Sequence, residues 1–383
     1  MRFITADHIF NGEKLLDAGS VLVLENNGTI SDILREGTIE NNRVEKSAGW
    51  LCPGFINIHA HLELSHLKDK IPQQTGLAGF GEKIISIRPG FKNEEIREAM
   101  QQADAFMFNE GIVACGDICN TADSLKMKEG SSIHYHSFIE LLALNPDRAN
   151  DMLTAGKYLF DQFENAQLSC SLAPHAAYSS SKKLIAAIAQ FNIARDLPAS
   201  IHNQESEEEN KFFNGEPSAF HNLYRFLNMD ISWFLAPGCS SLMHYTDALS
   251  TQQTILIHNT FTSSADLNFM NTENIYFGFC PNANIYIENQ LPDFKIFESY
   301  KTKITLGTDS LASNYKLSLI DEANVVLKNS NFTVEEVLRF MTLNGARALK
   351  LPEHFGKISI GKTAGLNLLQ IKNNQINFTK RIC

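Results

Sequence analysis

Two histidine pairs of the form His-x-His occur among the 12 histidines of the sequence, and both members of such a pair project from one face of a β-strand. His59 and His61 follow an apolar run, whereas His134 and His136 precede one. In barrels of parallel strands, catalytic groups gather at the carboxyl ends of the strands. The first pair is therefore the candidate site, and the second pair is interpreted as polar structure at the opposite end of its strand.

Three further residues that can bind a metal ion follow apolar runs in the same way. His202 and His258 each come directly after a short run, and Asp309 lies three residues beyond another. Together with the first histidine pair they form a set of imidazole nitrogens and a carboxylate oxygen. Such a set suits zinc, with iron(II) as the alternative. We therefore expect a divalent metal site at the ends of four strands.

Hydrolysis at a metal centre also requires a group that carries protons, and Glu205 lies three residues after His202. A metal ion lowers the pKa of water toward neutrality, and a carboxylate can then carry the proton to the leaving group. Glu207, Glu208 and Glu209 are instead typical of a solvated helix start. Glu205 is therefore the expected proton carrier.

The elements that must position these residues alternate between strands and helices. Helical patterns at 95–109, 181–191 and 334–349 fall among short apolar runs. Eight such runs favour a (β/α)8 barrel over an open sheet. The eight runs are 51–58, 112–118, 137–144, 168–173, 199–201, 255–257, 275–279 and 304–306. The long stretch 205–250 after the fifth run is expected to fold over the barrel mouth.

Both ends of the chain read as short strands and turns. Residues 21–24 form a strand-like run before a turn at 25–28, and residues 366–369 have the same character. We expect a small β-sandwich domain formed from residues 1–48 and 351–383, and a catalytic barrel over residues 49–350.

The bulk composition restricts the class of protein. A formal net charge of -10 argues against a surface that binds nucleic acid, which requires a basic face. No apolar run reaches the length of a membrane span, and no leader pattern precedes the first strand. The seven cysteines are scattered, without a C-x-x-C pair, which favours reduced thiols in a cytoplasmic protein.

The chain resembles the amidohydrolase superfamily, specifically the deaminase and chlorohydrolase branch that contains guanine deaminase, adenosylhomocysteine deaminase and aminofutalosine deaminase. The resemblance covers nearly the whole chain, with the motifs in the family's order. The matching segments are Pro53-Gly54-Phe55-Ile56-Asn57-Ile58-His59-Ala60-His61, Ala173-Pro174-His175-Ala176-Ala177-Tyr178-Ser179, His202-Asn203-Gln204-Glu205, His258-Asn259-Thr260 and Gly307-Thr308-Asp309-Ser310.

The resemblance implies specific roles for these residues. It implies a single metal ion, since binuclear relatives need a carboxylated lysine after the fourth strand, where this chain has none near His175. The implied metal ligands are His59, His61, His202 and Asp309. The implied catalytic residues are Glu205 as proton carrier, His258 as the group that orients water, and Asp309 as a proton acceptor. The implied substrate contacts are Glu63, Ser65, His175 and Tyr178.

Three functions remain open from the sequence. The first is deamination of an aromatic nitrogen heterocycle, such as a purine or aminofutalosine, with release of ammonia. The second is metal-dependent hydrolysis of a different bond, either in a cyclic amide, as in an imidazolonepropionase-like enzyme, or between carbon and a halogen, as in a chlorohydrolase. The third is a non-catalytic metal-binding protein, against which Glu205 and His258 argue. The expected partner is a small heterocyclic substrate, and neither nucleic acid nor a membrane is expected as a partner. Association into a homodimer is left open by the sequence.

Overall fold

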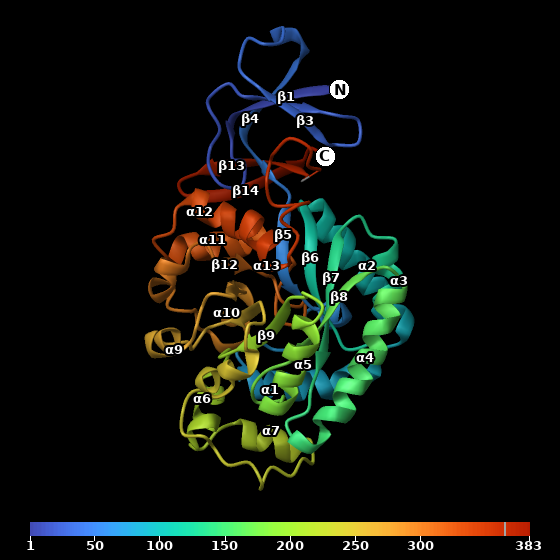
Figure 1. Cartoon of the computed structure of the whole chain (residues 1–383), viewed down its shortest axis with the longest axis vertical. Helices are drawn as coiled ribbons and strands as arrows, with labels where there is room; N and C mark the ends of the chain where they lie inside the picture. The colour runs from blue at the N-terminus through green and yellow to red at the C-terminus, as the bar shows by residue number, and fades with distance from the viewer. Residues whose placement is uncertain (364) are drawn as a thin grey trace.

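Eight parallel strands form the centre of the molecule in the computed structural model, which describes residues 1–363 and 365–383 (Figure 1). They make two four-stranded sheets in chain order, β5-β6-β7-β8 and β9-β10-β11-β12. Single bridges between Ala60 and Asp309 and between Ala176 and His202 join the sheets at both edges. The strands therefore enclose a (β/α)8 barrel. Their bounds are β5 (Phe55–Ala60), β6 (Ile112–Cys119), β7 (His134–Leu141), β8 (Ser169–Pro174), β9 (Ala199–Asn203), β10 (Thr254–His258), β11 (Ile275–Phe279) and β12 (Ile304–Leu306).

Helices follow the barrel strands and cover the outside of the barrel. Their starts are encoded locally: the Ser181 hydroxyl accepts from the Leu184 amide, and Thr333 and Glu336 form a reciprocal capping box. The bounds are α1 (Gly76–Ile87), α2 (Asn93–Asn109), α3 (Leu125–Glu129), α4 (Ala149–Asn165), α5 (Lys182–Ile193), α6 (Glu207–Asn214), α7 (Phe220–Phe226), α8 (Ser241–Tyr245), α9 (Ser264–Phe269), α10 (Pro281–Glu288), α11 (Leu319–Asn329), α12 (Val334–Arg339) and α13 (Gly345–Ala348).

The helix expected over 334–349 is divided by a π-helical turn at Phe340–Asn344. The Asn344 side chain donates to the carbonyls of Lys301 and Ile304, both at 2.8 Å, which ties this turn to the barrel. A Cβ at Gly345 would lie 2.8 Å from that of Ile56, so the helix approaches the first barrel strand closely only because this residue is glycine.

Strands from both termini form one six-stranded sheet, in the order β14-β13-β4-β1-β2-β3. The run expected as a single strand at 51–58 is in fact two strands, because Gly54 separates β4 in this sheet from β5 in the barrel. The terminal sheet therefore extends past residue 48. Its bounds are β1 (Arg2–Ile9), β2 (Val21–Leu24), β3 (Ile30–Leu34), β4 (Val44–Pro53), β13 (Leu366–Lys372) and β14 (Gln375–Arg381).

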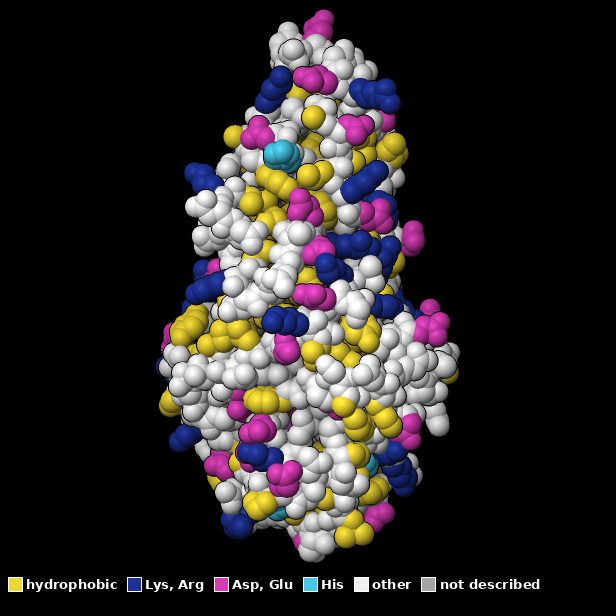
Figure 2. All heavy atoms as spheres, turned by 90° about the vertical axis from the view of Figure 1, so that its left-hand side faces the viewer, with side chains coloured by type: hydrophobic (Ala, Val, Ile, Leu, Met, Phe, Trp, Pro, Cys, Tyr) yellow, Lys and Arg dark blue, Asp and Glu magenta, His cyan; other side chains and the backbone are white. Residues whose placement is uncertain are grey.

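The barrel mouth lies at the end of the molecule opposite the terminal sheet, where α1, α6 and α7 are drawn in Figure 1. The expectation that residues 205–250 fold over the mouth is confirmed, because this stretch forms α6, α7 and α8, and Phe220 and Leu223 line the cavity there. Acidic and basic side chains are interspersed over the face shown in Figure 2. None of the described helices combines the length and apolarity that a membrane crossing requires.

Candidate functional site

Three strand ends bring imidazole and carboxylate groups to one point at the barrel mouth. The Nε2 atoms of His59 and His61 are 3.1 Å apart, and His61 Nε2 lies 3.3 Å from His202 Nε2. Asp309 Oδ1 is 3.6 Å from His59 Nε2 and 3.4 Å from His61 Nε2. These side chains come from the ends of β5, β9 and β12, and they are buried or nearly so. Because several electron-rich atoms face the same small space, the arrangement fits a cation between them.

Hydrogen bonds at the far side of the rings determine which nitrogens face this space. His202 Nδ1 donates to the backbone carbonyl of His175 at 2.9 Å, and His258 Nδ1 donates to Asn284 Oδ1 at 2.8 Å. Each ring therefore presents the lone pair of Nε2 to the centre, as metal-binding histidines do. His258 Nε2 is buried and has no hydrogen-bond partner within the described chain. An orphaned buried acceptor of this kind fits a site made for a further ligand or water.

Burial keeps these rings neutral. It lowers the pKa of His61 to about 3, with His59 adding to the effect, and lowers the pKa of His258 to about 4. The pKa of His202 is also well below its ordinary value, first through burial and then through the neighbouring rings. A neutral imidazole is the form that binds a metal ion, so the site is ready for one at neutral pH.

Glu205, His258 and Asp309 form a second group, with ligand-type atoms within 4.8 Å of one another. Glu205 Oε2 lies 3.5 Å from His258 Nε2, and burial raises the pKa of Glu205 well above its ordinary value. Asp309 Oδ2 accepts a 2.6 Å hydrogen bond from the Ser313 hydroxyl, which fixes the carboxylate. A buried carboxyl group with a raised pKa thus lies beside the imidazole centre.

The backbone at these strand ends is held in an unfavourable conformation. Gln204, His258, Asn259 and Asp309 all have positive φ angles, between 46° and 72°. Residues other than glycine rarely adopt this region, at a cost of roughly 1–3 kcal/mol each. The barrel therefore stabilises strained turns where the chemistry-bearing side chains project.

A cavity of about 370 Å³, here called the mouth cavity, opens above the imidazole centre. This volume is within the range of small-molecule sites, roughly 300–1,000 Å³. His175 and Tyr178 line it, together with Glu205 and the centre itself. His175 Nδ1 bonds with the Ser179 hydroxyl at 2.5 Å, and the Tyr178 ring stacks on Phe220 at 4.3 Å. The structure thus brings both expected contacts to the cavity.

The residues that line the mouth cavity without having been expected from the sequence include Arg88, Asn120 and Glu140. Glu140 lies near the end of β7, and its Oε2 accepts from Asn120 Nδ2 at 2.9 Å. Its Oε1 is buried without a hydrogen-bond partner in the described chain, 3.6 Å from His202 Nδ1. Burial raises the pKa of Glu140 to about 7. Glu140 could have been recognised in the sequence as a candidate site residue, because it is a carboxylate within the apolar run 137–144.

Glu63 lies behind the wall of the mouth cavity. Its carboxylate accepts from the Thr121 hydroxyl at 2.9 Å, from the amides of Thr121 and Asn120, and from Arg88 at 3.3 Å. It does not line the mouth cavity, whereas Arg88 does. Glu63 therefore positions Arg88 and the end of β6.

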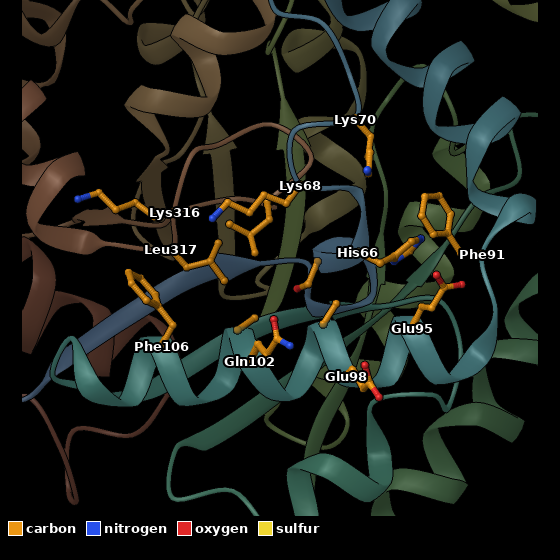
Figure 3. A pocket seen from close by; sticks show the side chains of 14 residues that line it. His66, Lys68, Lys70, Phe91, Glu95, Glu98, Gln102, Phe106, Lys316 and Leu317 are labelled. Atoms are coloured by element: carbon orange, nitrogen blue, oxygen red, sulfur yellow. The ribbon is translucent and has the colours of Figure 1, made fainter.

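Ser65 lines a different hollow, here called the lateral cavity, of about 530 Å³. Figure 3 shows this cavity above α2, with His66 and Phe91 at one end and Lys68, Lys316 and Leu317 at the other. The lateral cavity is the larger of the two but contains none of the converging imidazoles. The structure therefore separates Ser65 from the expected substrate contacts.

The second histidine pair lies at the other end of the barrel, at the start of β7. His134 is exposed, and His136 is buried with its two ring nitrogens 2.8 Å from the hydroxyls of Ser169 and Ser171. Both ring nitrogens of His136 therefore have hydrogen-bond partners within the protein.

Comparisons with known proteins all point to the same protein family. Residues 50–381 match the amidohydrolase family. The chain is 27% identical to an adenosine deaminase of Helicobacter pylori, over 83% of this chain and 78% of that protein. It is 26% identical to a 5′-deoxyadenosine deaminase of Methanococcus maripaludis, over 96% and 86%. Its fold matches the crystal structure of Helicobacter pylori aminofutalosine deaminase in complex with methylthio-coformycin, with a TM-score of 0.82, 23% identity and coverage of 98% and 93%. The chain therefore belongs to the amidohydrolase family, as a hydrolase that acts on carbon–nitrogen bonds.

Proposed function

We propose that the protein is a metal-dependent deaminase that hydrolyses the exocyclic amine of an adenine-type ring and releases ammonia. The observation that carries this proposal is the convergence of His59, His61, His202 and Asp309, with Glu205 beside them under an open cavity. The two curated relatives, deaminases of adenosine and 5′-deoxyadenosine, support an adenine nucleoside as the substrate.

The residues fit one divalent metal ion, which we infer to be zinc. Three ring nitrogens and one carboxylate oxygen would hold it, namely those of His59, His61, His202 and Asp309. Neutral imidazoles with one carboxylate form a donor set that zinc prefers, and iron(II) is the alternative. When bound, the ion would lower the pKa of water enough to supply a nucleophile near neutral pH. A single ion agrees with the lack of a lysine between the end of β8 and Lys182.

Glu205 would move the protons of the reaction. Its carboxyl group is buried at the base of the mouth cavity, 3.5 Å from His258. From there it can take a proton from the attacking water and deliver it to a ring nitrogen of the substrate. A second proton transfer to the departing amine completes ammonia, so that water and the aminated ring become the oxo ring and ammonia.

His258 and Asp309 would orient the attacking water. The Asn284 bond keeps the Nε2 lone pair of His258 directed into the site. Asp309, whose carboxylate is fixed by Ser313, would accept a proton from this water. Fixed acceptors need no rearrangement during the reaction, which is how preorganised sites lower a barrier.

His175, Tyr178 and Glu140 would contact the substrate, because all three line the mouth cavity. Glu63 would act through Arg88, and Ser65 is omitted because it lines the lateral cavity. We also infer a cytoplasmic location, because all seven cysteines are unpaired, as in a reducing compartment.

Metal analysis combined with an ammonia-release assay tests the function. Protein loaded with zinc or iron(II) would be incubated with adenosine, 5′-deoxyadenosine, guanosine and cytidine. We expect one metal ion per chain and ammonia from the adenine nucleosides above the other amines. Chloride release from a chlorotriazine, or opening of a cyclic amide, without ammonia from any nucleoside would replace deamination by one of the alternative hydrolyses.

A further inference from the structure

A glutamate on α11 is buried outside the mouth cavity. Glu322 is 0% exposed and lies in the first turn of α11, a helix that contacts both α10 and β12 (Figure 1). Its side chain is not among the described residues that line the mouth cavity. A glutamate is almost never fully buried unless its oxygens have partners, so the partners of Glu322 indicate what it does.

One oxygen of Glu322 holds the start of α10. Glu322 Oε2 accepts from the Asn282 amide at 2.9 Å, in the first turn of that helix. The first amides of a helix have no acceptor within the helix, so an outside oxygen fixes where the helix begins. Two residues further along α10, Asn284 Oδ1 accepts from His258 Nδ1 at 2.8 Å. The orientation of the His258 ring therefore depends on a helical turn that Glu322 anchors.

The other oxygen of Glu322 holds the loop after β12. Glu322 Oε1 accepts from Asn314 Nδ2 at 2.7 Å, and the same amide group donates to the Thr308 carbonyl at 2.8 Å. Thr308 directly precedes Asp309, whose φ angle is 57°. Because residues other than glycine rarely adopt this conformation, the surrounding structure must maintain it. The hydrogen bonds of Asn314 provide such a support next to Asp309.

Both contacts require an oxygen at this position, because both partners are donors. Burial raises the pKa of Glu322 to about 8, and the hydrogen bonds from Asn282 and Asn314 act against this shift. A glutamine would offer one oxygen and one NH₂ group to the same two donors. If Asn314 turned its amide to accept from the new NH₂ group, its own NH₂ group would leave the Thr308 carbonyl. The neutral side chain of the same shape therefore loses one of the contacts in either orientation.

We propose that Glu322 is a positioning residue that holds His258 and Asp309 in place at the same time. It acts through the start of α10 on one side and through Asn314 on the other. One buried glutamate thereby fixes both the ring that would orient the attacking water and a carboxylate that would hold the metal ion. This inference rests on the proposed metal-dependent deaminase function and adds a residue on which the reaction depends from outside the mouth cavity.

Glu322→Gln tests the inference on zinc-loaded enzyme with adenosine as the substrate. We expect kcat to fall roughly 10–100-fold and KM to change less than about twofold, because the side chains that line the mouth cavity are unaltered. Zinc affinity, measured by competition with a chromogenic chelator, should fall about tenfold. Unchanged kcat and zinc affinity overturn the positioning role even if the urea midpoint falls, since a merely structural glutamate would behave in that way. A fall in kcat alone overturns the link to Asp309, and a fall in zinc affinity alone overturns the link to His258.

The neighbouring Asp321 provides a matched control. Its carboxylate pairs with Lys316 at 2.8 Å, and its side chain is 39% exposed. Asp321→Asn neutralises a carboxylate one residue away on the same helix, and an exposed ion pair contributes little to stability. Its kcat and zinc affinity should therefore equal those of the unmodified protein. Equal losses in Asp321→Asn and Glu322→Gln would show that the effect does not come from the contacts of Glu322, and would overturn the proposal.

A second variant, Asn314→Ala, decides the matter if Glu322→Gln does not fold. It removes the contact with the Thr308 carbonyl and leaves the bond between Glu322 and the Asn282 amide in place. Zinc affinity should again fall about tenfold, and an unchanged affinity overturns the link to Asp309. Chelator competition needs no substrate, so it separates the two proposals. If no nucleoside releases ammonia, the deaminase function fails, and the zinc affinities of the variants still decide whether Glu322 positions Asp309.

Discussion

Replacement of Lys128 by methionine should lower the free energy of unfolding by about 3–5 kcal/mol, because a buried carboxylate then loses its cation. Lys128 Nζ lies 2.6 Å from Asp117 Oδ2 and 2.9 Å from the Ser137 hydroxyl, and both members of the ion pair have side chains that are 0% exposed. Asp117 Oδ1 accepts a 2.8 Å hydrogen bond from the Leu62 amide, directly after His61. The pair therefore stabilises the turn that carries the first candidate metal ligands.

Urea denaturation of the metal-loaded proteins would measure this loss. Burial alone would lower the pKa of Lys128, but Asp117 and Cys119 raise it above the ordinary value. A raised folded-state pKa means that the stabilisation is fully present below the unfolded pKa of lysine, about 10.4, and is lost as the pH rises beyond it. The difference between the two proteins should therefore be undiminished at pH 7–9 and decrease only in strongly basic solution.

Two control variants make the test specific. Lys126 lies on the same helix, pairs with Glu129 at 2.9 Å and has a 92% exposed side chain, so Lys126→Met should cost less than about 1 kcal/mol. The double variant Asp117→Asn, Lys128→Met removes both charges and should recover most of the loss. If Lys128→Met alone costs no more than Lys126→Met, the argument from an uncompensated buried charge is refuted.

Further changes test the chemistry of the site. Glu205→Gln should keep its metal ion but lose roughly 10²–10⁴-fold in turnover, and full activity would remove Glu205 from proton transfer. His59→Ala should lose bound metal in elemental analysis, whereas His134→Ala should keep it; the reverse result would contradict the placement of the two pairs. Asn284→Leu should lower activity roughly 10–100-fold with the fold intact by circular dichroism, because His258 loses the acceptor that orients it. Chelation should lower the free energy of unfolding by about 4 kcal/mol relative to protein with free metal at a thousand times its Kd, and an unchanged midpoint would argue against a metal site.

The fold was largely predictable because each barrel strand is a short apolar run between helical patterns. The exception is the run 51–58, which belongs to β4 up to Pro53 and to β5 from Phe55. Periodicity cannot divide this run, because both parts are buried on either side of Gly54. The Gly54 amide bonds to the Gly365 carbonyl at 3.2 Å, more than 300 residues away in the sequence, so tertiary contact determines the division.

The candidate site was predictable only where a local signal exists. A histidine directly after an apolar run is visible in the sequence, and His202 and His258 were identified in this way. Arg88 and Asn120 carry no such signal, since they reach the mouth cavity through η3 (Arg88–Gly90) and the end of β6. Ser65 carries no such signal either, because its distance along the chain from His61 does not reveal that it lines the lateral cavity beside α2.

The two parts of the site rest on different kinds of element, namely strand ends and helices. The imidazoles and Asp309 project from strand ends whose strained backbone is fixed by the barrel. Apolar side chains that line the mouth cavity come instead from α1 and α7, which lie over the mouth and contact each other. Substitutions at Ile84 or Leu223 can change the shape of the cavity without moving a strand. We therefore expect the hydrolytic chemistry to depend on the barrel strands and the choice among substrates to depend on α1 and α7.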